Sequence, residues 1–114
     1  KIDRIDQLED GVRIIDYKTG ENAPKKIDWE KKMQLLIYQI AAEDFFRVKP
    51  IELTYHYLKE NKKLSFLGSE EEKEKVISLI LKEINKIKEK NFQPTPGWNC
   101  KSCDFKEICP YAKN

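Results

Sequence analysis

The sequence has no long hydrophobic run, and its 114 residues include only one histidine and three cysteines. A membrane helix needs about 20 consecutive apolar residues, and in this chain, where 37% of the residues are charged, no segment approaches that length. No signal-peptide pattern opens the printed sequence. We therefore expect a globular, cytoplasmic protein with no membrane partner.

The sequence also lacks a strong excess of charge of one sign. The 22 basic and 20 acidic residues are interspersed and leave a formal net charge of +2. This balance is compatible with a nucleic-acid partner but does not require one. Function must therefore be inferred from motifs.

The odd number of cysteines argues against a disulfide framework. All three lie within ten residues, as Cys100-x2-Cys103-x5-Cys109. Three ligands cannot complete a tetrahedral four-ligand site, yet the clustering favours a metal site over three separate structural thiols. A zinc-binding interaction module stays open, although His56 lies far away along the chain and is more typical of a structural or surface histidine.

Residues 1–7 and 12–19 predict a β-hairpin, because β-branched and charged residues alternate on either side of Asp10-Gly11. With these two residues at the centre of the turn, Asp3 pairs with Lys18, and Ile5 pairs with Asp16. Side chains alternate between the two faces of a strand. In this register the two aspartates and the lysine project from one face, with Arg4 and Asp6 on the other.

The remaining sequence predicts a helix, two strands and a second helix. The first helix begins after Asp28, a candidate N-cap, and runs to about Arg47, followed by strands over 51–59 and 64–67. Ser69 and Glu72 form a capping box for a helix that ends near Lys90. The apolar stripe expected on the first helix comprises Trp29, Met33, Leu36, Ile37, Ile40 and Ala41.

This order of elements predicts an α/β fold with a central mixed sheet flanked by helices. We assign residues 1–93 to a core and residues 94–114 to a cysteine-bearing tail. The strand-like pattern already present at Lys1 suggests a core that is incomplete at its N-terminus.

Asp16 and Lys18 follow Ile14 and Ile15, which indicate a strand buried on both faces. An arbitrary Asp-x-Lys is usually a solvated ion pair worth little. At the end of a buried strand, the same residues would instead enter a cleft, where an unpartnered charge costs several kcal/mol. Two carboxylates with a nearby amine suit metal-assisted hydrolysis of phosphodiesters.

Three segments carry a resemblance: Ile-Asp-Arg-Ile-Asp at 2–6, Ile-Ile-Asp-Tyr-Lys-Thr-Gly at 14–20, and Gln34-x3-Tyr38. Together they resemble the PD-(D/E)XK nuclease superfamily, specifically its RecB-like branch, over essentially the whole chain. That branch includes nuclease domains attached to recombination helicases and four-cysteine CRISPR-associated exonucleases. The resemblance implies a restriction-endonuclease-like fold.

By this resemblance, Asp3 and Asp16 are ligands of Mg²⁺ or Mn²⁺, and the carbonyl of Tyr17 is a further metal contact. Lys18 would position or deprotonate the attacking water. Gln34 and Tyr38 would contact DNA and order the site; the alternative for these two residues is a helix edge packed beside the sheet. The family also shows an upstream helix with a glutamate, which this sequence does not contain, so the metal site is expected to be incomplete.

Cys100, Cys103 and Cys109, followed by Pro110, resemble three of the four ligands of a 4Fe-4S iron–sulfur cluster in the same branch. The fourth cysteine would lie before Lys1. The function implied is a metal-dependent deoxyribonuclease, an exonuclease of DNA repair, recombination or CRISPR adaptation, with DNA and a helicase domain or subunit as partners. The alternative is a catalytically inactive DNA-binding or scaffold domain of the same fold in a helicase-nuclease complex.

Overall fold

The computed structural model describes residues 1–112, which contain four strands, two α-helices and one short 3-10 helix. In chain order these are β1 (Arg4–Gln7), β2 (Val12–Lys18), α1 (Trp29–Asp44), β3 (Pro50–Tyr57), β4 (Lys62–Phe66), α2 (Glu70–Lys88) and η1 (Trp98–Ser102). Contacts divide the chain into one compact unit of residues 1–80 and a second unit from residue 81 onward. The predicted boundary after residue 93 falls inside the second unit and stays a prediction.

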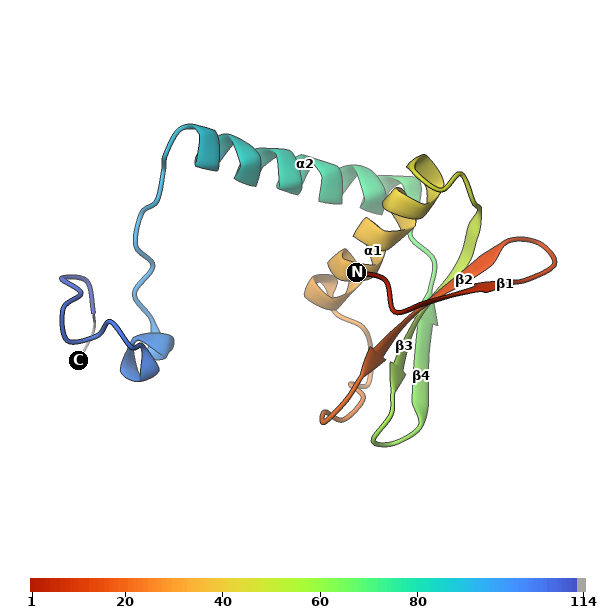
Figure 1. Ribbon diagram of the computed structural model, residues 1–114, viewed down its shortest axis with the longest axis horizontal. Helices are drawn as coiled ribbons and strands as arrows, with labels where there is room; N and C mark the ends of the chain where they lie inside the picture. Colours follow the sequence, from red (N-terminus) through yellow and green to blue (C-terminus); the bar gives the residue numbers. More distant parts are fainter. Residues whose placement is uncertain (113–114) are drawn as a thin grey trace. The chain divides into compact units, whose positions relative to one another are not determined.

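The first unit contains a mixed four-stranded sheet in the order β1-β2-β3-β4 (Figure 1). β1 and β2 are antiparallel, β2 and β3 parallel, and β3 and β4 antiparallel. α1 provides the crossover between the two parallel strands, as such a pairing requires. The predicted α/β fold with a mixed sheet is confirmed.

The predicted hairpin is present, but its predicted register is wrong. Ile5 pairs with Ile14 instead of Asp16, and Arg4 pairs with Ile15. The N–H of Leu8 donates a 2.8 Å hydrogen bond to the Gly11 carbonyl, so the turn is centred on Glu9 and Asp10 instead of Asp10 and Gly11, and each pairing partner lies two residues earlier than predicted. A shift of two residues preserves the faces of both strands.

Gly11 is required by a close backbone approach at the end of this loop. A Cβ at this position would lie 2.3 Å from the carbonyl oxygen of Lys49. That oxygen accepts a 2.8 Å hydrogen bond from the N–H of Val12. The glycine therefore lets the start of β2 meet the segment that leads into β3.

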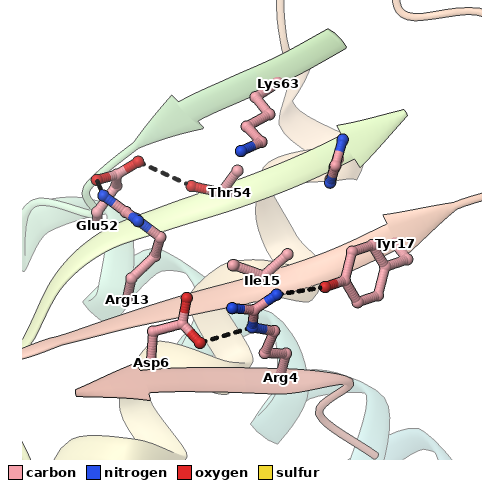
Figure 2. Close-up of a pocket in the computed structure, with 9 residues that line it drawn as sticks. Arg4, Asp6, Arg13, Ile15, Tyr17, Glu52, Thr54 and Lys63 are labelled. Carbon is pink, nitrogen blue, oxygen red and sulfur yellow. Dashed lines mark hydrogen bonds and ion pairs between the residues drawn. The ribbon is translucent and has the colours of Figure 1, made fainter. Parts of the chain in front are cut away.

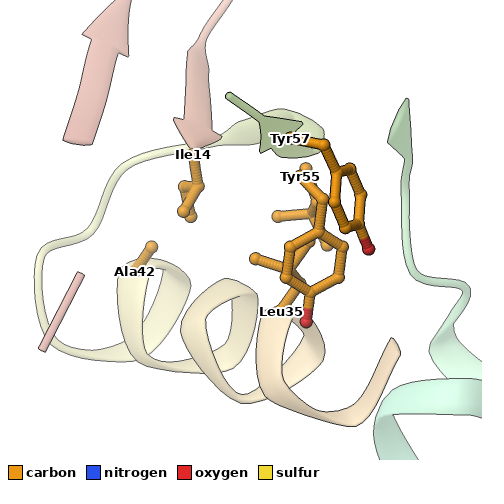
Figure 3. Packing of buried hydrophobic residues seen from close by; sticks show 6 residues of the cluster. Ile14, Leu35, Ala42, Tyr55 and Tyr57 are labelled. Carbon is orange, nitrogen blue, oxygen red and sulfur yellow. The ribbon is translucent and has the colours of Figure 1, made fainter. Parts of the chain in front are cut away.

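The core lies between α1 and one face of the sheet (Figure 3). Ile14, Leu53 and Tyr55 contribute from the strands and are fully buried. Their partners on α1 differ from the predicted stripe, since Leu35 and Ala42 are buried while Ile37 is 43% exposed. The complete buried set on α1 is Leu35, Leu36, Gln39 and Ala42.

Gln39 is a buried polar residue of this helix face. Its side-chain oxygen accepts a 3.0 Å hydrogen bond from the N–H of Gly68, and its nitrogen donates to the Gly68 carbonyl at 3.3 Å. A Cβ on Gly68 would lie 2.2 Å from Leu36 and 2.6 Å from the Gln39 oxygen. The segment between β4 and α2 is thereby held against α1.

The first turns of α2 are capped and paired with α1. Ser69 and Glu72 form the predicted capping box, with the N–H of Glu72 donating to the Ser69 hydroxyl at 3.1 Å. Ion pairs join Lys32 to Glu72 at 3.0 Å and Glu43 to Lys73 at 2.8 Å. Within residues 1–112, no helix has both the length and the apolar character that crossing a bilayer demands.

Candidate active site

The carboxyl end of β2 places Asp16 and Lys18 on the face that α1 covers. Asp16 is 4% exposed, and its Oδ2 lies 3.1 Å from the Nζ of Lys18. This contact does not have hydrogen-bond geometry, so the buried Oδ2 has no hydrogen-bond partner among the described residues. Since burying a carboxylate is costly without compensation, the lysine ammonium is the charge that makes this position tolerable.

Gln34 and Tyr38, one turn apart on α1, meet the end of β2. The Gln34 oxygen accepts a 3.2 Å hydrogen bond from Lys18, and its amide nitrogen lies 3.4 Å from Asp16 Oδ1. The same nitrogen donates to the Tyr38 hydroxyl at 3.2 Å. Gln34 therefore fixes the relative positions of the acid and the amine, and the structure brings both helix residues together with Asp16 and Lys18.

Tyr55 is a site residue that the sequence interpretation missed. Its hydroxyl donates a 2.5 Å hydrogen bond to the Lys31 carbonyl and lies 3.3 Å from the Gln34 oxygen, while its ring lies 5.1 Å below the Lys18 ammonium. Burial, reinforced by Asp16, raises the pKa of Tyr55 above its ordinary value. Alternation along the strand predicted over 51–59 shows only which face Tyr55 occupies, and its contact with this group follows from its pairing with Asp16 across parallel strands.

Asp3 lies one residue before β1, next to the end of β2. Its Oδ2 accepts a 2.9 Å hydrogen bond from the backbone N–H of Tyr17. The pair Arg4 and Ile15 is the neighbouring step of the ladder, so continuing the register would place Asp3 opposite Asp16. Asp3 is exposed where Asp16 is buried, so the two carboxylates differ in their solvation.

Tyr17, Arg4 and Asp6 lie on the opposite face of the sheet, as the alternation predicts. Arg4 donates to the Tyr17 hydroxyl at 3.0 Å and to Asp6 at 2.6 Å. His56 stands beside Tyr17 on that face and contacts Asn61 at 2.9 Å. The histidine is thus separated from Asp16 and Lys18 by the sheet.

The three sequence segments described above meet at the end of β2: Asp3 comes from the first, Asp16 and Lys18 from the second, and Gln34 and Tyr38 from the third. A family model of the PD-(D/E)XK nuclease superfamily matches residues 1–110. The chain belongs to this superfamily. No curated protein matches the chain significantly.

The PD-(D/E)XK assignment makes the chain a nuclease domain and agrees with its restriction-endonuclease-like mixed sheet. Members of the superfamily typically use divalent metal ions. The donor set fits such an ion, because carboxylate oxygens are the ligands that Mg²⁺ and Mn²⁺ prefer and Asp16 Oδ2 has unused acceptor capacity. Within residues 1–112, however, no three His, Cys, Asp or Glu side chains gather as a metal site.

The three cysteines of the PD-(D/E)XK chain are not disulfide-bonded and do not form such a cluster either. Cys100 lies in η1, where its sulfur accepts a hydrogen bond of 3.4 Å from the N–H of Gly97. Cys103 and Cys109 follow on the surface of the second unit. With three thiols in the sequence, the chain does not supply the four ligands of a complete cluster.

Proposed function

We propose that the chain is the metal-dependent DNA nuclease domain of a RecB-like protein. The observation that carries this proposal is the hydrogen-bonded group at the end of β2, in which buried Asp16, Lys18 and Gln34 lie within 3.4 Å of one another. Burying charged groups costs stability, and such groups are concentrated at functional sites. Exonuclease action in DNA repair, recombination or CRISPR adaptation is the role that the resemblance favours.

Asp3 and Asp16 are the residues that would hold Mg²⁺ or Mn²⁺, with the Tyr17 carbonyl as the further contact. When bound, the ion would polarise a phosphate oxygen and lower the pKa of a coordinated water. The hydrogen bond from the Tyr17 N–H orients the exposed Asp3 carboxylate. The buried carboxylate of Asp16 and the exposed carboxylate of Asp3 would then each offer an oxygen to the same cation.

Lys18 has the position of a group that orients the attacking water or accepts its proton. Its ammonium is held by Asp16, by the Gln34 oxygen and by the face of the Tyr55 ring. These contacts leave the amine in one place while a phosphate approaches, and a positive charge there offsets the charge that develops in the transition state. Gln34 holds Lys18 and Asp16 from α1, and Gln34 and Tyr38 together would contact the DNA substrate.

The experiment that tests this function replaces Asp16 by Asn and Lys18 by Ala and measures cleavage of labelled DNA with Mg²⁺ or Mn²⁺. Each substitution is expected to lower the rate at least about 100-fold, the usual effect of losing a general acid–base or charge-stabilising group. Asp10→Asn and Lys25→Ala are matched controls at exposed loop positions and should leave the rate unchanged.

Undiminished cleavage by both D16N and K18A would contradict the assignment. The two variants must keep the circular dichroism of the parent chain, so that loss of activity is not loss of fold. A wild-type chain that binds DNA but never cleaves it would support the inactive scaffold domain instead.

The cysteine segment would hold a 4Fe-4S cluster together with a fourth thiolate from outside this sequence. The spacing of Cys100, Cys103 and Cys109 supports this, as does the N–H donated to the Cys100 sulfur, since hydrogen bonds to cluster sulfurs are common in such sites. A helicase domain or subunit is the partner that the RecB-like assignment implies.

A further inference from the structure

The sheet has a second polar site on the face opposite α1. A cavity of about 300 Å³ opens there, lined by side chains from all four strands (Figure 2). α1 packs against the other face, where Ile14 and Tyr55 are buried. The lining residues that matter here are Arg4, Arg13, Tyr17, Glu52, His56 and Lys63.

Both arginines of this cavity are held in place by carboxylates. Arg4 donates through Nε to Asp6 at 2.6 Å and through one terminal nitrogen to the Tyr17 hydroxyl. Arg13 pairs with Glu52 at 3.0 Å. A guanidinium has five N–H donors, so each arginine retains donors beyond these contacts, at a fixed position.

Both carboxylate oxygens of Glu52 contact neighbouring side chains of the protein. Its Oε1 accepts 3.0 Å hydrogen bonds from Thr54 and from Ser65, and its Oε2 faces Arg13. Burial alone would raise the pKa of Glu52, but the bonds from Ser65, Thr54 and Arg13 outweigh it and lower that pKa. The carboxylate is therefore ionised and directed at the protein, which leaves the cations to face an incoming ligand.

The charge of the lining favours an anion. Arg4, Arg13 and Lys63 face only two carboxylates, those of Asp6 and Glu52. Lys63 pairs across the strands with His56 and is exposed. No ion pair of Lys63 is found within residues 1–112.

Two partly exposed rings lie between these cations. The centroids of Tyr17 and His56 are 5.7 Å apart, with their planes tilted by 44°. Arg4 touches the hydroxyl of the first ring, and Lys63 neighbours the second on β4. Rings flanked by cations are the arrangement with which proteins bind single-stranded nucleic acid, stacking bases and pairing phosphates.

We propose that this cavity binds a nucleotide of single-stranded DNA, with its base against Tyr17 and His56 and its phosphates at Arg4, Arg13 and Lys63. The proposal rests on the proposed nuclease function, because the occupant is a strand of the substrate. Tyr17 lies between Asp16 and Lys18 in the sequence but projects from the other face. A strand held here would thus continue around the end of β2 to the hydrolytic group.

The test measures binding of a fluorescein-labelled oligo(dT) of about 20 nucleotides to the full chain by anisotropy, in EDTA so that metal-dependent cleavage does not occur. His56→Ala is expected to weaken binding about 5-fold or more, the effect of losing one stacked base. Lys63→Glu should weaken it similarly and reduce the dependence of log affinity on log salt by about 0.7.

Lys62→Glu is the matched control, because Lys62 is also exposed on β4 but pairs with Tyr57 and projects from the opposite face. Equal losses in the Lys62 and Lys63 variants would overturn the proposal, since net charge alone would then explain the binding. Affinity unchanged by both H56A and K63E would overturn it as well.

A second measurement does not depend on any variant. Titrating the wild-type chain with oligo(dT) should shift the backbone amide NMR signals of His56 and Lys63. Shifts confined to residues on the face that α1 covers would contradict the site. The two proposals fail separately. If the wild-type chain cleaves DNA and the H56A and K63E variants bind it normally, only the proposed binding site is rejected. If the wild-type chain never cleaves DNA but binds it through His56 and Lys63, only the catalytic role is rejected.

Discussion

At the scale of single residues, the site depends on how Gln34 connects groups from three elements. Its oxygen faces Lys18 of β2 and Tyr55 of β3, and its nitrogen faces Asp16 of β2 and Tyr38 of its own helix. The sequence motif predicts Gln34 and Tyr38 but not Tyr55. Strand alternation shows only which face a tyrosine occupies, whereas hydrogen bonding depends on which strand lies next to which.

Tyr55→Phe tests this connection without changing the shape of the core. The substitution removes one hydroxyl, which donates to Lys31 and lies near Gln34, and keeps the ring beneath Lys18. Loss of a buried hydrogen bond is expected to lower the free energy of unfolding by about 1 kcal/mol. Urea denaturation measures it.

Tyr111→Phe is the matched control, since Tyr111 is 56% exposed and its hydroxyl should contribute nothing measurable. Equal stability of Y55F and the wild-type chain would show that the hydroxyl contributes no net stability. A stability loss as large as that of deleting the whole ring would point to repacking instead.

At the scale of elements, the sequence predicts the existence and order of the helices and strands better than their faces. α1 has apolar residues on several sides, so its period does not reveal which side meets the sheet. The structure buries Leu35 and Gln39 and leaves Ile37 exposed, the opposite of the predicted stripe for Leu35 and Ile37. The predicted hairpin register failed for a local reason, because the turn is centred on Glu9 and Asp10, one residue before the Asp10-Gly11 pair that the sequence signal indicates.

The ion pairs between α1 and the start of α2 make their contact sensitive to acid. The hydrogen bond from Lys32 lowers the pKa of Glu72 below its ordinary value. For Glu43, burial acts upward, but the bonds from Lys73 and Gln39 prevail and its pKa is also lowered. Both carboxylates contribute stability that is fully present above the unfolded-state pKa of about 4.3 and is lost as the pH falls through the lower folded-state values.

Urea denaturation between pH 6 and pH 3 should therefore show a loss of stability that Glu72→Gln reduces. Each partly exposed pair contributes at most about 1 kcal/mol. The E72Q variant should therefore lose no more than this amount of stability at neutral pH, and its stability should fall less steeply as the pH drops. Glu74→Gln, an exposed position on the same helix, is the control and should leave the pH profile as it is. An E72Q profile parallel to that of the wild type would show that this pair does not link stability to pH.

At the scale of the whole molecule, the fold class could be predicted from the order of the elements. The juxtaposition of Asp16, Lys18, Gln34 and Tyr38 could be predicted from the resemblance of their motifs to those of the superfamily. The cavity on the face opposite α1 could not be predicted from the sequence. It combines side chains from all four strands, and its charged members, each viewed in its own strand, are only charged residues on the face opposite the core. Such a site arises from the order of the strands in the sheet, which local patterns do not contain.

The metal content of the chain is a prediction at this scale, because it depends on ligands beyond any one element. The 114 residues supply three thiols, so the chain alone, purified without oxygen, should contain well under four irons per molecule. A protein that includes a fourth cysteine ligand should contain about four irons with matching acid-labile sulfide. One tightly bound zinc with no sulfide would exclude the cluster and favour a zinc module.

The bond between Gln39 and Gly68 has a consequence for how this sequence can change over time. A side-chain amide offers the same donor and acceptor as a peptide group, so Gln39 serves Gly68 as a neighbouring strand would. An aliphatic replacement would leave both backbone groups of Gly68 without their partner, and any side chain at 68 would collide with Leu36. Two positions 29 residues apart in the sequence are therefore constrained by one contact: position 39 needs a side-chain amide, and position 68 needs glycine.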